Sequence, residues 1–584
     1  MNVDTLASRA PTRTAPADGA DASEAATVPS ASRRAWATAA ALAGLAIVGA
    51  RWWAVHGRRE YSLWPDEPAQ LAIARFVGGG THWTMRNHSI WRPGYGTLLG
   101  PVYLVTDDPQ IVFRSAMALN ALLGGVAAAL LVLLARRLTA FGPGGAALAA
   151  VAVCATPALL FTSGFVWSES LIAPLYLGTV LALMRFWEAP DVRRGLVVAA
   201  LCGAGLATHS RLLPLAVVTT LLVAMAWERR RLRLVDAVAI VAGLAVALLA
   251  ASRYSAFVTG RLWDDPSERN SVGGVIDQFA DPLAIGVSAL GQAWYLSVGS
   301  LGVLGLAVVE IVRARRDGRL PAAYVVIALV VAAQVALAVV FMADRWRPDQ
   351  LIYGRYNDVV VAPLLLVGLA CLTGRARGVW TERQLVLTWV ATAAATLLAG
   401  WVMWWLRGDQ LRESNGLEPM ILAVQPFVDG RPAIPLVRIT LLALACAAVL
   451  LGAAMTRRAW VTGGVVALLL VAGGLRTDDV LENGWNGSGG LQRVAELAGP
   501  RGPLAGGEPV DYYLPAASNS TGRLMLYQWY LPASEFTVVG QPLTQASSPY
   551  VFADLDTPAL DAAGAAVVWR DPIKAVGLWL RPGR

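Results

Sequence analysis

Long apolar runs alternate with short polar segments over most of the chain. Each run is close to the ~20 residues that an α-helix needs to cross the hydrocarbon core of a bilayer. The pattern predicts about 13 spans within residues 33–475, of which 195–209 is short. They lie near residues 35–55, 112–135, 143–163, 168–187, 195–209, 211–228, 234–254, 284–312, 321–343, 356–373, 385–406, 434–455 and 459–475.

Arginine clusters fall in alternate loops between these spans: Arg136-Arg137, Arg193-Arg194, Arg229-Arg230-Arg231, Arg313/Arg315/Arg316, Arg375/Arg377 and Arg457-Arg458. Cytoplasmic loops of membrane proteins carry an excess of basic residues. If the N-terminus is cytoplasmic, every cluster is cytoplasmic. We therefore predict a multi-pass protein of the plasma membrane, with its N-terminus inside and its C-terminal segment outside.

Composition supports this prediction. Of 584 residues, 56% are hydrophobic and only 15% are charged, and the mean hydropathy is +0.52. These values exclude a disordered chain and argue against a soluble one. The net charge of +8 comes from arginines in short runs between apolar segments, so it indicates membrane topology and no nucleic acid. The 4 cysteines lie in apolar segments without paired spacing, so no disulfide framework is predicted.

The two ends of the chain differ from the middle. Residues 1–32 lack apolar periodicity and predict a disordered cytoplasmic tail; a cleaved signal peptide is the alternative, but the apolar run that follows is long enough to span. Residues 476–584 have soluble character. They predict a helix at Leu491–Leu497 and strands at Val510–Tyr513, Glu535–Val539 and Ala565–Trp569. The predicted fold class is an all-α polytopic membrane protein, residues 33–475, with a small extracytoplasmic α/β domain.

The first outer loop, residues 56–110, carries the most informative motif. Asp66 and Glu67 are adjacent acids between prolines, just beyond the first span. Two amphipathic stretches follow, Ala69–Val77 and Gly94–Val105, and between them lie Arg86, Asn87, His88, Trp91 and Arg92. One interpretation is a solvated loop in which Asp66 caps the helix that follows.

A catalytic interpretation rests on other polar groups predicted for the same membrane face. They are Ser168-Glu169, Thr208-His209-Ser210-Arg211, Arg345, Arg347 and Gly354-Arg355-Tyr356-Asn357-Asp358. A carboxylate can take the proton from an acceptor hydroxyl that attacks an anomeric carbon. Cations stabilise the charge that develops on a phosphate leaving group. Acids and cations on one face therefore indicate sugar transfer from a lipid-phosphate donor.

The order of these elements resembles the GT-C superfamily of integral-membrane glycosyltransferases, near the protein O-mannosyltransferase and aminoarabinose transferase type. The resemblance covers roughly residues 35–400 and includes the Asp66-Glu67 pair, the amphipathic stretches after it, Phe113-Arg114 through Asn120, Ser168-Glu169, Thr208–Arg211 and Gly354–Asp358. It implies a polyprenyl-phosphate sugar as donor and inversion at the anomeric carbon. The acceptor stays unidentified.

The resemblance also implies roles for individual residues. Asp66 maps to the catalytic base and Glu169 to the acid of the second outer loop, and Glu67 would orient substrate or hold a metal. Residues that would bind the donor and its phosphate are His88, Arg92, Glu169, His209, Arg211, Arg355 and Tyr356. Some members use a divalent metal; Asp66, Glu67, Glu169 and His88 are the candidate ligands, although no ligand spacing demands one. No other cofactor is predicted.

Two alternatives remain at this stage. A transporter or flippase of lipid-linked sugars would carry ionisable residues near the bilayer midplane. Here Glu169, Asp236 and Glu310 lie near predicted span ends, which favours chemistry at a surface. The other alternative is a non-catalytic protein that has the same membrane fold and serves in binding or assembly.

Overall fold

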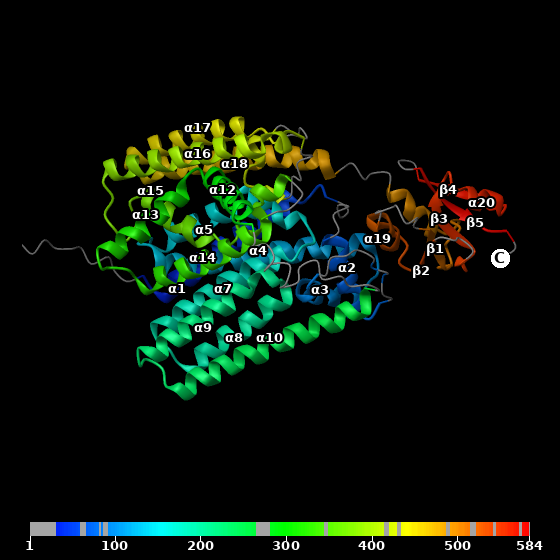
Figure 1. Cartoon of the computed structure of the whole chain (residues 1–584), viewed down its shortest axis with the longest axis horizontal. Helices are drawn as coiled ribbons and strands as arrows, with labels where there is room; N and C mark the ends of the chain where they lie inside the picture. The colour runs from blue at the N-terminus through cyan, green and yellow to red at the C-terminus, as the bar shows by residue number, and fades with distance from the viewer. Residues whose placement is uncertain are drawn as a thin grey trace, which may run out of the picture.

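The structure, a computed structural model, describes residues 31–58, 66–80, 83, 85, 91–263, 281–343, 348–413, 420–428, 434–485, 491–513, 521–540, 545–571 and 575–582. Long helices form a bundle, and a small domain of strands and short helices lies beside one end of it (Figure 1). The predicted fold class is confirmed. The predicted disordered tail lies outside the described residues, apart from residues 31 and 32.

Each predicted span coincides with a helix or a helix pair of the bundle. The helices are α1 (Arg33–Ala54), α2 (Asp66–Val77), α3 (Gly94–Leu99), α4 (Pro109–Leu138), α5 (Pro143–Cys154), α6 (Pro157–Phe161), α7 (Glu169–Glu188), α8 (Val192–Thr208), α9 (Leu213–Glu228), α10 (Leu234–Leu262), α12 (Pro282–Gly299), α13 (Val303–Arg316), α14 (Ala322–Met342), α15 (Ala362–Leu372), α16 (Glu382–Glu413), α17 (Leu436–Met455) and α18 (Ala459–Trp485). Short 3₁₀ turns connect several of them: η1 (Gly100–Leu104), η2 (Thr162–Gly164), η3 (Ser210–Leu212), η5 (Pro348–Ile352), η6 (Gly354–Tyr356) and η8 (Gln425–Phe427).

Two of the predicted spans are broken. Among the described residues, 9 helices are long and apolar enough to cross a membrane, and two bent pairs raise the number to 11. The pair α5 and α6 bends by 70° and the pair α12 and α13 by 106°. Pro157 begins α6, and Gly302 precedes α13 with a φ of 76°, so the backbone leaves the helical conformation at both places. The protein is a multi-pass membrane protein, and the count of about 13 spans stays a prediction.

Helices α1 and α4 pack closely because glycines face each other. A Cβ atom on Gly44 would lie 3.0 Å from the carbonyl oxygen of Gly125, and such small residues let membrane helices approach. Beside this contact Arg51, which is 2% exposed, donates to the backbone oxygens of Asn120 at 3.2 Å and Leu159 at 2.5 Å. Arg51 therefore ties α1 to both α4 and α6.

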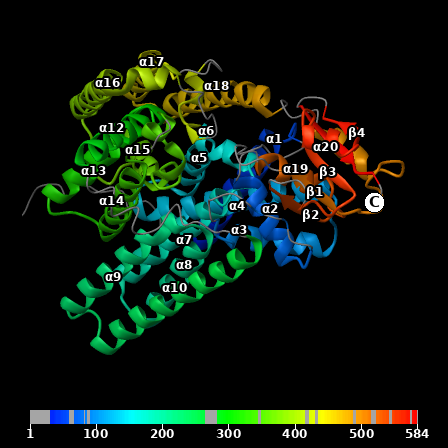
Figure 2. The same ribbon diagram turned by 45° about the vertical axis from the view of Figure 1, so that its right-hand side comes forward.

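Figure 2 shows α2 and α3 on the side of the bundle that faces the C-terminal domain, and this end of the bundle is called the site end below. It carries α2, α3 and the segments at residues 91–108, 162–168, 209–212, 348–361 and 420–428. The amphipathic stretches predicted in the first loop are confirmed as α2 and as α3 with η1. These helices pack face to face, because Gly96 has no side chain where the side chain of Ile73 lies.

The C-terminal domain contains a five-stranded sheet with the order β2-β1-β3-β5-β4. Its elements are η10 (Leu491–Ala498), β1 (Val510–Tyr513), α19 (Thr521–Tyr530), β2 (Phe536–Val539), β3 (Tyr550–Asp554), α20 (Pro558–Ala562), β4 (Ala566–Arg570) and β5 (Val576–Leu580). Strands β2, β1 and β3 are parallel, and β5 pairs antiparallel with both β3 and β4. The predicted strands correspond to β1, β2 and β4, and the predicted helix is a 3₁₀ turn, whereas β3 and β5 were not predicted.

The C-terminal domain contacts α2 directly. The guanidinium of Arg75, near the end of α2, donates to the backbone oxygen of Pro532 at 2.8 Å. The ring of Trp83, just after α2, meets that of Trp529 edge to face, with 6.2 Å between centroids. The helix that begins at Asp66 is therefore anchored at its other end by the C-terminal domain.

The contact of Arg51 with α4 predicts a strong dependence on Gly124. A Cβ atom at position 124 would lie 2.4 Å from Cδ and Nε of Arg51, whose guanidinium is held by two backbone oxygens. We expect Gly124→Ala to lower the free energy of unfolding by about 1–3 kcal/mol, as overpacking does. Thermal unfolding in detergent measures this. The control is Gly49→Ala on α1, where a Cβ meets no atom within 4 Å and stability should hold or rise. Equal stability of the two variants would contradict the packing argument.

Candidate active site

Arg355 lies at the centre of a cluster that joins three distant parts of the chain. It belongs to the η6 turn, between α14 and α15. Its Nε donates to Oε1 of Glu169, and its Nη1 donates to Oδ2 of Asp66. Its guanidinium lies flat against the ring of Trp167, 3.8 Å from the centroid. A planar group with donors on two edges is suited to holding two carboxylates apart by a fixed distance.

Asp66 is the most accessible of these charged groups. It is the first residue of α2, and its second oxygen, Oδ1, accepts a hydrogen bond from the indole of Trp91 at 2.9 Å. Its side chain is 23% exposed, whereas those of Glu169 and Arg355 are 3% and 8% exposed. Both carboxylate oxygens of Asp66 therefore contact other side chains, while part of the group remains open to incoming molecules.

Glu169 also forms an ion pair with a second arginine. It is the first residue of α7, and its Oε1 also lies 3.1 Å from Nη1 of Arg211. The same nitrogen of Arg211 donates to the backbone oxygen of Arg355 at 3.3 Å, and its guanidinium lies 5.0 Å from the ring centroid of Tyr356. Glu169 thus fixes the relative positions of both guanidinium groups.

His209 supports the turn that carries Arg211. Its Nδ1 accepts a hydrogen bond from the backbone N–H of Arg211 at 3.1 Å, and its ring meets that of Tyr356 edge to face. Burial and the charge of Arg211 lower the pKa of His209 to about 3, against the raising effect of Glu169. The imidazole is therefore neutral at pH 7, so it orders the turn and adds no positive charge.

Glu67 faces a different neighbour from Asp66. Its carboxylate accepts hydrogen bonds from Arg58 at 3.0 and 3.2 Å and from the backbone N–H of Val166 at 2.8 Å. The guanidinium of Arg58 lies between the rings of Phe113 and Phe165, 5.4 and 4.8 Å from their centroids. Successive residues of a helix point about 100° apart, so two adjacent acids at the start of α2 reach different partners. Glu67 holds in place the segment that leads to Trp167 and Glu169.

The remaining predicted residues divide between those near the cluster and those that are not described. Arg92 lies close enough for its charge to lower the pKa of His209, and its backbone oxygen accepts from Gln70 at 3.2 Å. His88, with Arg345 and Arg347, lies outside the described residues.

The sequence assigned no individual role to two residues of the cluster, Trp167 and Asp358, although Asp358 belongs to the predicted Gly354–Asp358 motif. Trp167 supplies the surface on which Arg355 lies, and Asp358 supplies a further acid whose Oδ2 accepts from the hydroxyl of Tyr295 at 3.3 Å. Burial raises the pKa of Asp358 to about 8, while the Tyr295 hydroxyl and Arg211 oppose the shift. Asp358 is therefore mostly protonated at pH 7. Its place three residues after Arg355 was the available signal.

The described residues do not fit a divalent metal. Asp66 and Glu169, two of the predicted ligands, share the guanidinium of Arg355, and Glu67 pairs with Arg58. Within the described ranges no group of three or more His, Cys, Asp or Glu side chains could hold a metal ion. Asp66 and Glu169 instead balance the charges of Arg355 and Arg211.

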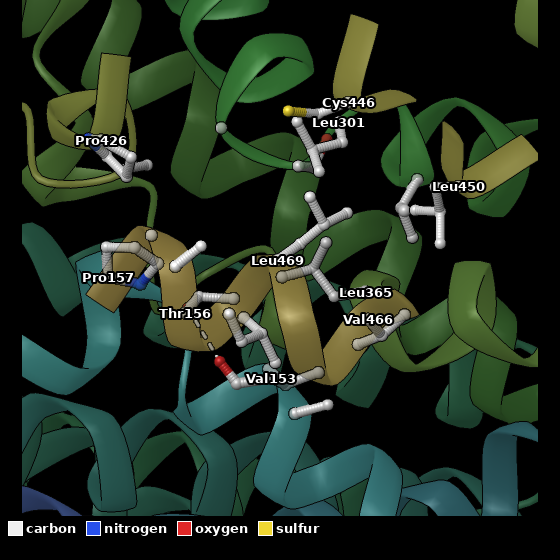
Figure 3. Close-up of a pocket in the computed structure, with 18 of the residues that line it drawn as sticks. Val153, Thr156, Pro157, Leu301, Leu365, Pro426, Cys446, Leu450, Val466 and Leu469 are labelled. Carbon is white, nitrogen blue, oxygen red and sulfur yellow. Dashed lines mark hydrogen bonds between the residues drawn. The ribbon is translucent and has the colours of Figure 1, made fainter. Parts of the chain in front are cut away.

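An apolar cavity of about 250 Å³ lies close to this cluster (Figure 3). Both helix breaks line it, through Val153, Thr156 and Pro157 on one side and Gly299, Ser300 and Leu301 on the other; α15, α17 and α18 complete its walls. The segment 420–428 connects the cavity to the cluster. Ala423 lines the cavity while its N–H donates to the Tyr295 hydroxyl at 3.0 Å, and Met420 accepts from Arg355 through Sδ at 3.7 Å.

Comparison with known proteins gives matches among solved structures only. No protein-family model matches the chain, and no curated protein is significantly similar to it. The chain is similar to ArnT from Cupriavidus metallidurans bound to undecaprenyl phosphate, with 16% identity, a TM-score of 0.53 and coverage of 94% of this chain and 98% of that one. The apo state of that ArnT gives 16% identity, a TM-score of 0.51 and coverage of 92% and 97%. Arabinosyltransferase EmbB from Mycobacterium smegmatis gives 17% identity, a TM-score of 0.41 and coverage of 76% and 40%. At this identity the likeness to ArnT shows the fold, and the predicted GT-C resemblance is confirmed at that level.

The contacts of Glu67 predict a structural role for this acid. Because Arg58 and Glu67 are 2% and 0% exposed, Glu67→Gln removes a negative charge that lies against a buried guanidinium. We expect the free energy of unfolding to fall by about 1–3 kcal/mol, because the amide still accepts hydrogen bonds but carries no charge. Denaturant unfolding in detergent measures the loss. Glu188→Gln, which breaks the exposed pair with Arg137, is the control and should cost about 0.5 kcal/mol or less. Losses of equal size would show that the buried pair has no special role.

Proposed function

We propose that this protein transfers a sugar from a polyprenyl-phosphate donor to an acceptor hydroxyl at the extracytoplasmic face of the plasma membrane, with inversion at the anomeric carbon. The single observation that carries the proposal is an accessible carboxylate, Asp66, paired with the buried guanidinium of Arg355, while Glu169 joins Arg355 to a second buried guanidinium, that of Arg211. The GT-C fold supports it, and so does the undecaprenyl phosphate bound to the ArnT of similar fold.

Asp66 is the general base of this proposal. The acceptor hydroxyl must lose a proton as its oxygen attacks the anomeric carbon, and Asp66 is the exposed carboxylate that can take it. Trp91 and Arg355 hold one oxygen each, so the carboxylate is oriented before substrate arrives. Direct attack by the acceptor, with no covalent intermediate, gives inversion.

Arg355 and Arg211 bind the donor phosphate. When the bond between the anomeric carbon and the phosphate oxygen breaks, negative charge moves onto the phosphate, and preorganised cations lower the energy of that change. Glu169 holds both guanidinium groups in position. Glu67 and His209 act one step further away. Glu67 fixes the segment before Glu169, and His209 fixes the turn that carries Arg211.

The alternative, a transporter or flippase, has less support. Such a protein needs ionisable groups along a path through the bundle, near the bilayer midplane. The described cluster lies instead at helix starts and turns of the site end, at the beginnings of α2 and α7 and in η3 and η6. That position fits a reaction at the membrane surface.

The apolar cavity is the proposed site of the isoprenoid chain of the donor. An apolar cavity stays dry, and inside a bilayer hydrocarbon is what can fill it. At ~30 Å³ for a water-sized group, the cavity has room for one short stretch of chain. The 420–428 segment contacts both the cavity and Arg355, so in this proposal the phosphate lies beside Arg355 and its chain follows that segment into the cavity.

The role of Asp66 predicts the effect of removing its charge. Asp66→Asn should lower the rate of sugar transfer by about 10²–10⁴-fold, because the amide cannot accept the acceptor's proton. The measurement is transfer from a radiolabelled polyprenyl-phosphate sugar in membranes. Asp108→Asn is the matched control, since Asp108 caps α4 through its side chain and an amide oxygen caps equally well. Transfer at the wild-type rate by Asp66→Asn would rule out this base.

The cavity predicts a difference between two neighbouring glycines of α18. A Cβ atom on Gly473 would contact Pro426 at 3.5 Å and Pro157 at 3.6 Å, whereas a Cβ atom on Gly474 meets nothing within 4 Å. Gly473→Leu should fill the cavity and raise KM for a long-chain donor on the order of tenfold or more, since each buried CH₂ contributes about 0.8 kcal/mol. KM for a donor with a short chain should not change. Gly474→Leu is the control. Equal effects of both variants on KM would show that the isoprenoid chain does not bind in this cavity.

A further inference from the structure

The central charges of the cluster are already paired before any substrate binds. Asp66 and Glu169 oppose Arg355 and Arg211, and Asp358 is mostly protonated. A phosphate that joins this set adds uncompensated negative charge in a partly buried place, where like charges are poorly screened. The binding and release of the phosphate product therefore depend on whether one of these carboxylates is protonated.

Arg355 is placed to serve two anions in turn. Its Nη1 donates to Asp66, the exposed carboxylate, while its Nε donates to Glu169, which is 3% exposed. Contact with Trp167 and Met420 keeps the guanidinium from leaving the site. If the bond to Asp66 is lost, Nη1 can donate to another anion, and in the proposed function that anion is the donor phosphate.

We propose that Arg355 is handed from Asp66 to the leaving phosphate during the reaction, and that deprotonation of Asp66 then expels the product. This inference rests on the proposed function and assigns a coupling between its two ends. Glu169 keeps Arg355 in place throughout, so the handover needs a change of hydrogen-bond partner at one nitrogen only.

The step is balanced in protons and electrons. The acceptor oxygen forms a bond to the anomeric carbon and its proton moves to Asp66, which becomes neutral. The bond from that carbon to the phosphate oxygen breaks, and its electron pair stays on the phosphate. One negative charge has moved from Asp66 to the phosphate, so the net charge around Arg355 is unchanged. When Asp66 later loses its proton to water, two anions compete for Nη1 and the polyprenyl phosphate leaves.

The surroundings of Asp66 are consistent with this exchange. The titratable or charged side chains that face its carboxylate among the described residues are Arg355 and Tyr356 of η6, and Glu169, His209 and Arg211 lie beyond them. Burial would lower the pKa of Arg355, but Glu169 and Asp66 raise it well above its usual value. Arg355 therefore stays charged in both partner states, as the handover requires.

The test is the affinity for farnesyl phosphate, a short polyprenyl phosphate, measured with the full chain in detergent or nanodiscs. Asp66→Asn should transfer sugar about 10²–10⁴-fold more slowly than the wild type, yet bind farnesyl phosphate at least about tenfold more tightly, because a like charge is removed. Calorimetry in two buffers of different ionisation enthalpy should show that the wild type takes up more protons on binding than Asp66→Asn does. The phosphate's own protonation is common to both proteins and cancels.

Two further variants keep the test sharp. Trp91→Phe removes the other hydrogen bond to Asp66 but keeps its charge, so it should not tighten binding. Arg355→Lys keeps a cation without the planar fork, so in a double-mutant cycle with Asp66→Asn the tightening should shrink. The handover would be overturned if Asp66→Asn bound farnesyl phosphate no more tightly than the wild type, or if Trp91→Phe tightened binding as much as Asp66→Asn. Sugar transfer by the wild type would still support the proposed function in either case. If Asp66→Asn bound farnesyl phosphate more tightly but the wild type transferred no sugar, the proposed function would be overturned and the cluster would be an anion-binding site only.

Discussion

The ion pairs of Arg355 are the interaction on which the site end depends. A guanidinium that is 8% exposed has lost most of its water, and only close carboxylates and an aromatic face compensate for that loss. Asp66 and Glu169 come from segments far from residue 355 in the sequence, so three connections of the bundle must meet at one place. The same two pairs that stabilise this meeting put the proposed base in contact with a proposed phosphate-binding group.

Several other contacts hold those three segments together. Glu67 and Arg58 fix the segment before Glu169, His209 orders the turn of Arg211, and the C-terminal domain holds the far end of α2 through Arg75. The break between α12 and α13 contributes as well, because Tyr295 in α12 connects Asp358 with the 420–428 segment. The 420–428 segment thus contacts both the apolar cavity at the two breaks and the charged cluster.

Hydropathy predicted where the helices lie but not how they bend. The run 284–312 reads as one span because most of its residues are apolar, yet Leu301 and Gly302 take positive φ and the helix turns by 106°. Short strands in the C-terminal domain were partly missed for a related reason. β3 pairs with β1 and β5, neither of which is next to it in the chain, and local pattern does not record such pairing; β5 pairs with β3 and with its neighbour β4.

The sequence by itself determined a multi-pass bundle, an acidic motif after the first span and a set of cations beside later spans, because length, hydropathy and charge are local properties of the chain. Only the tertiary structure decided which of these groups work together. Asp66 and Glu67 are neighbours in sequence, but their side chains point to different partners, one to Arg355 and the other to Arg58. Trp167 had no polar signal at all and still forms the surface under Arg355. Side-chain direction and long-range packing set these pairings, and neither is encoded in the spacing of residues along the chain.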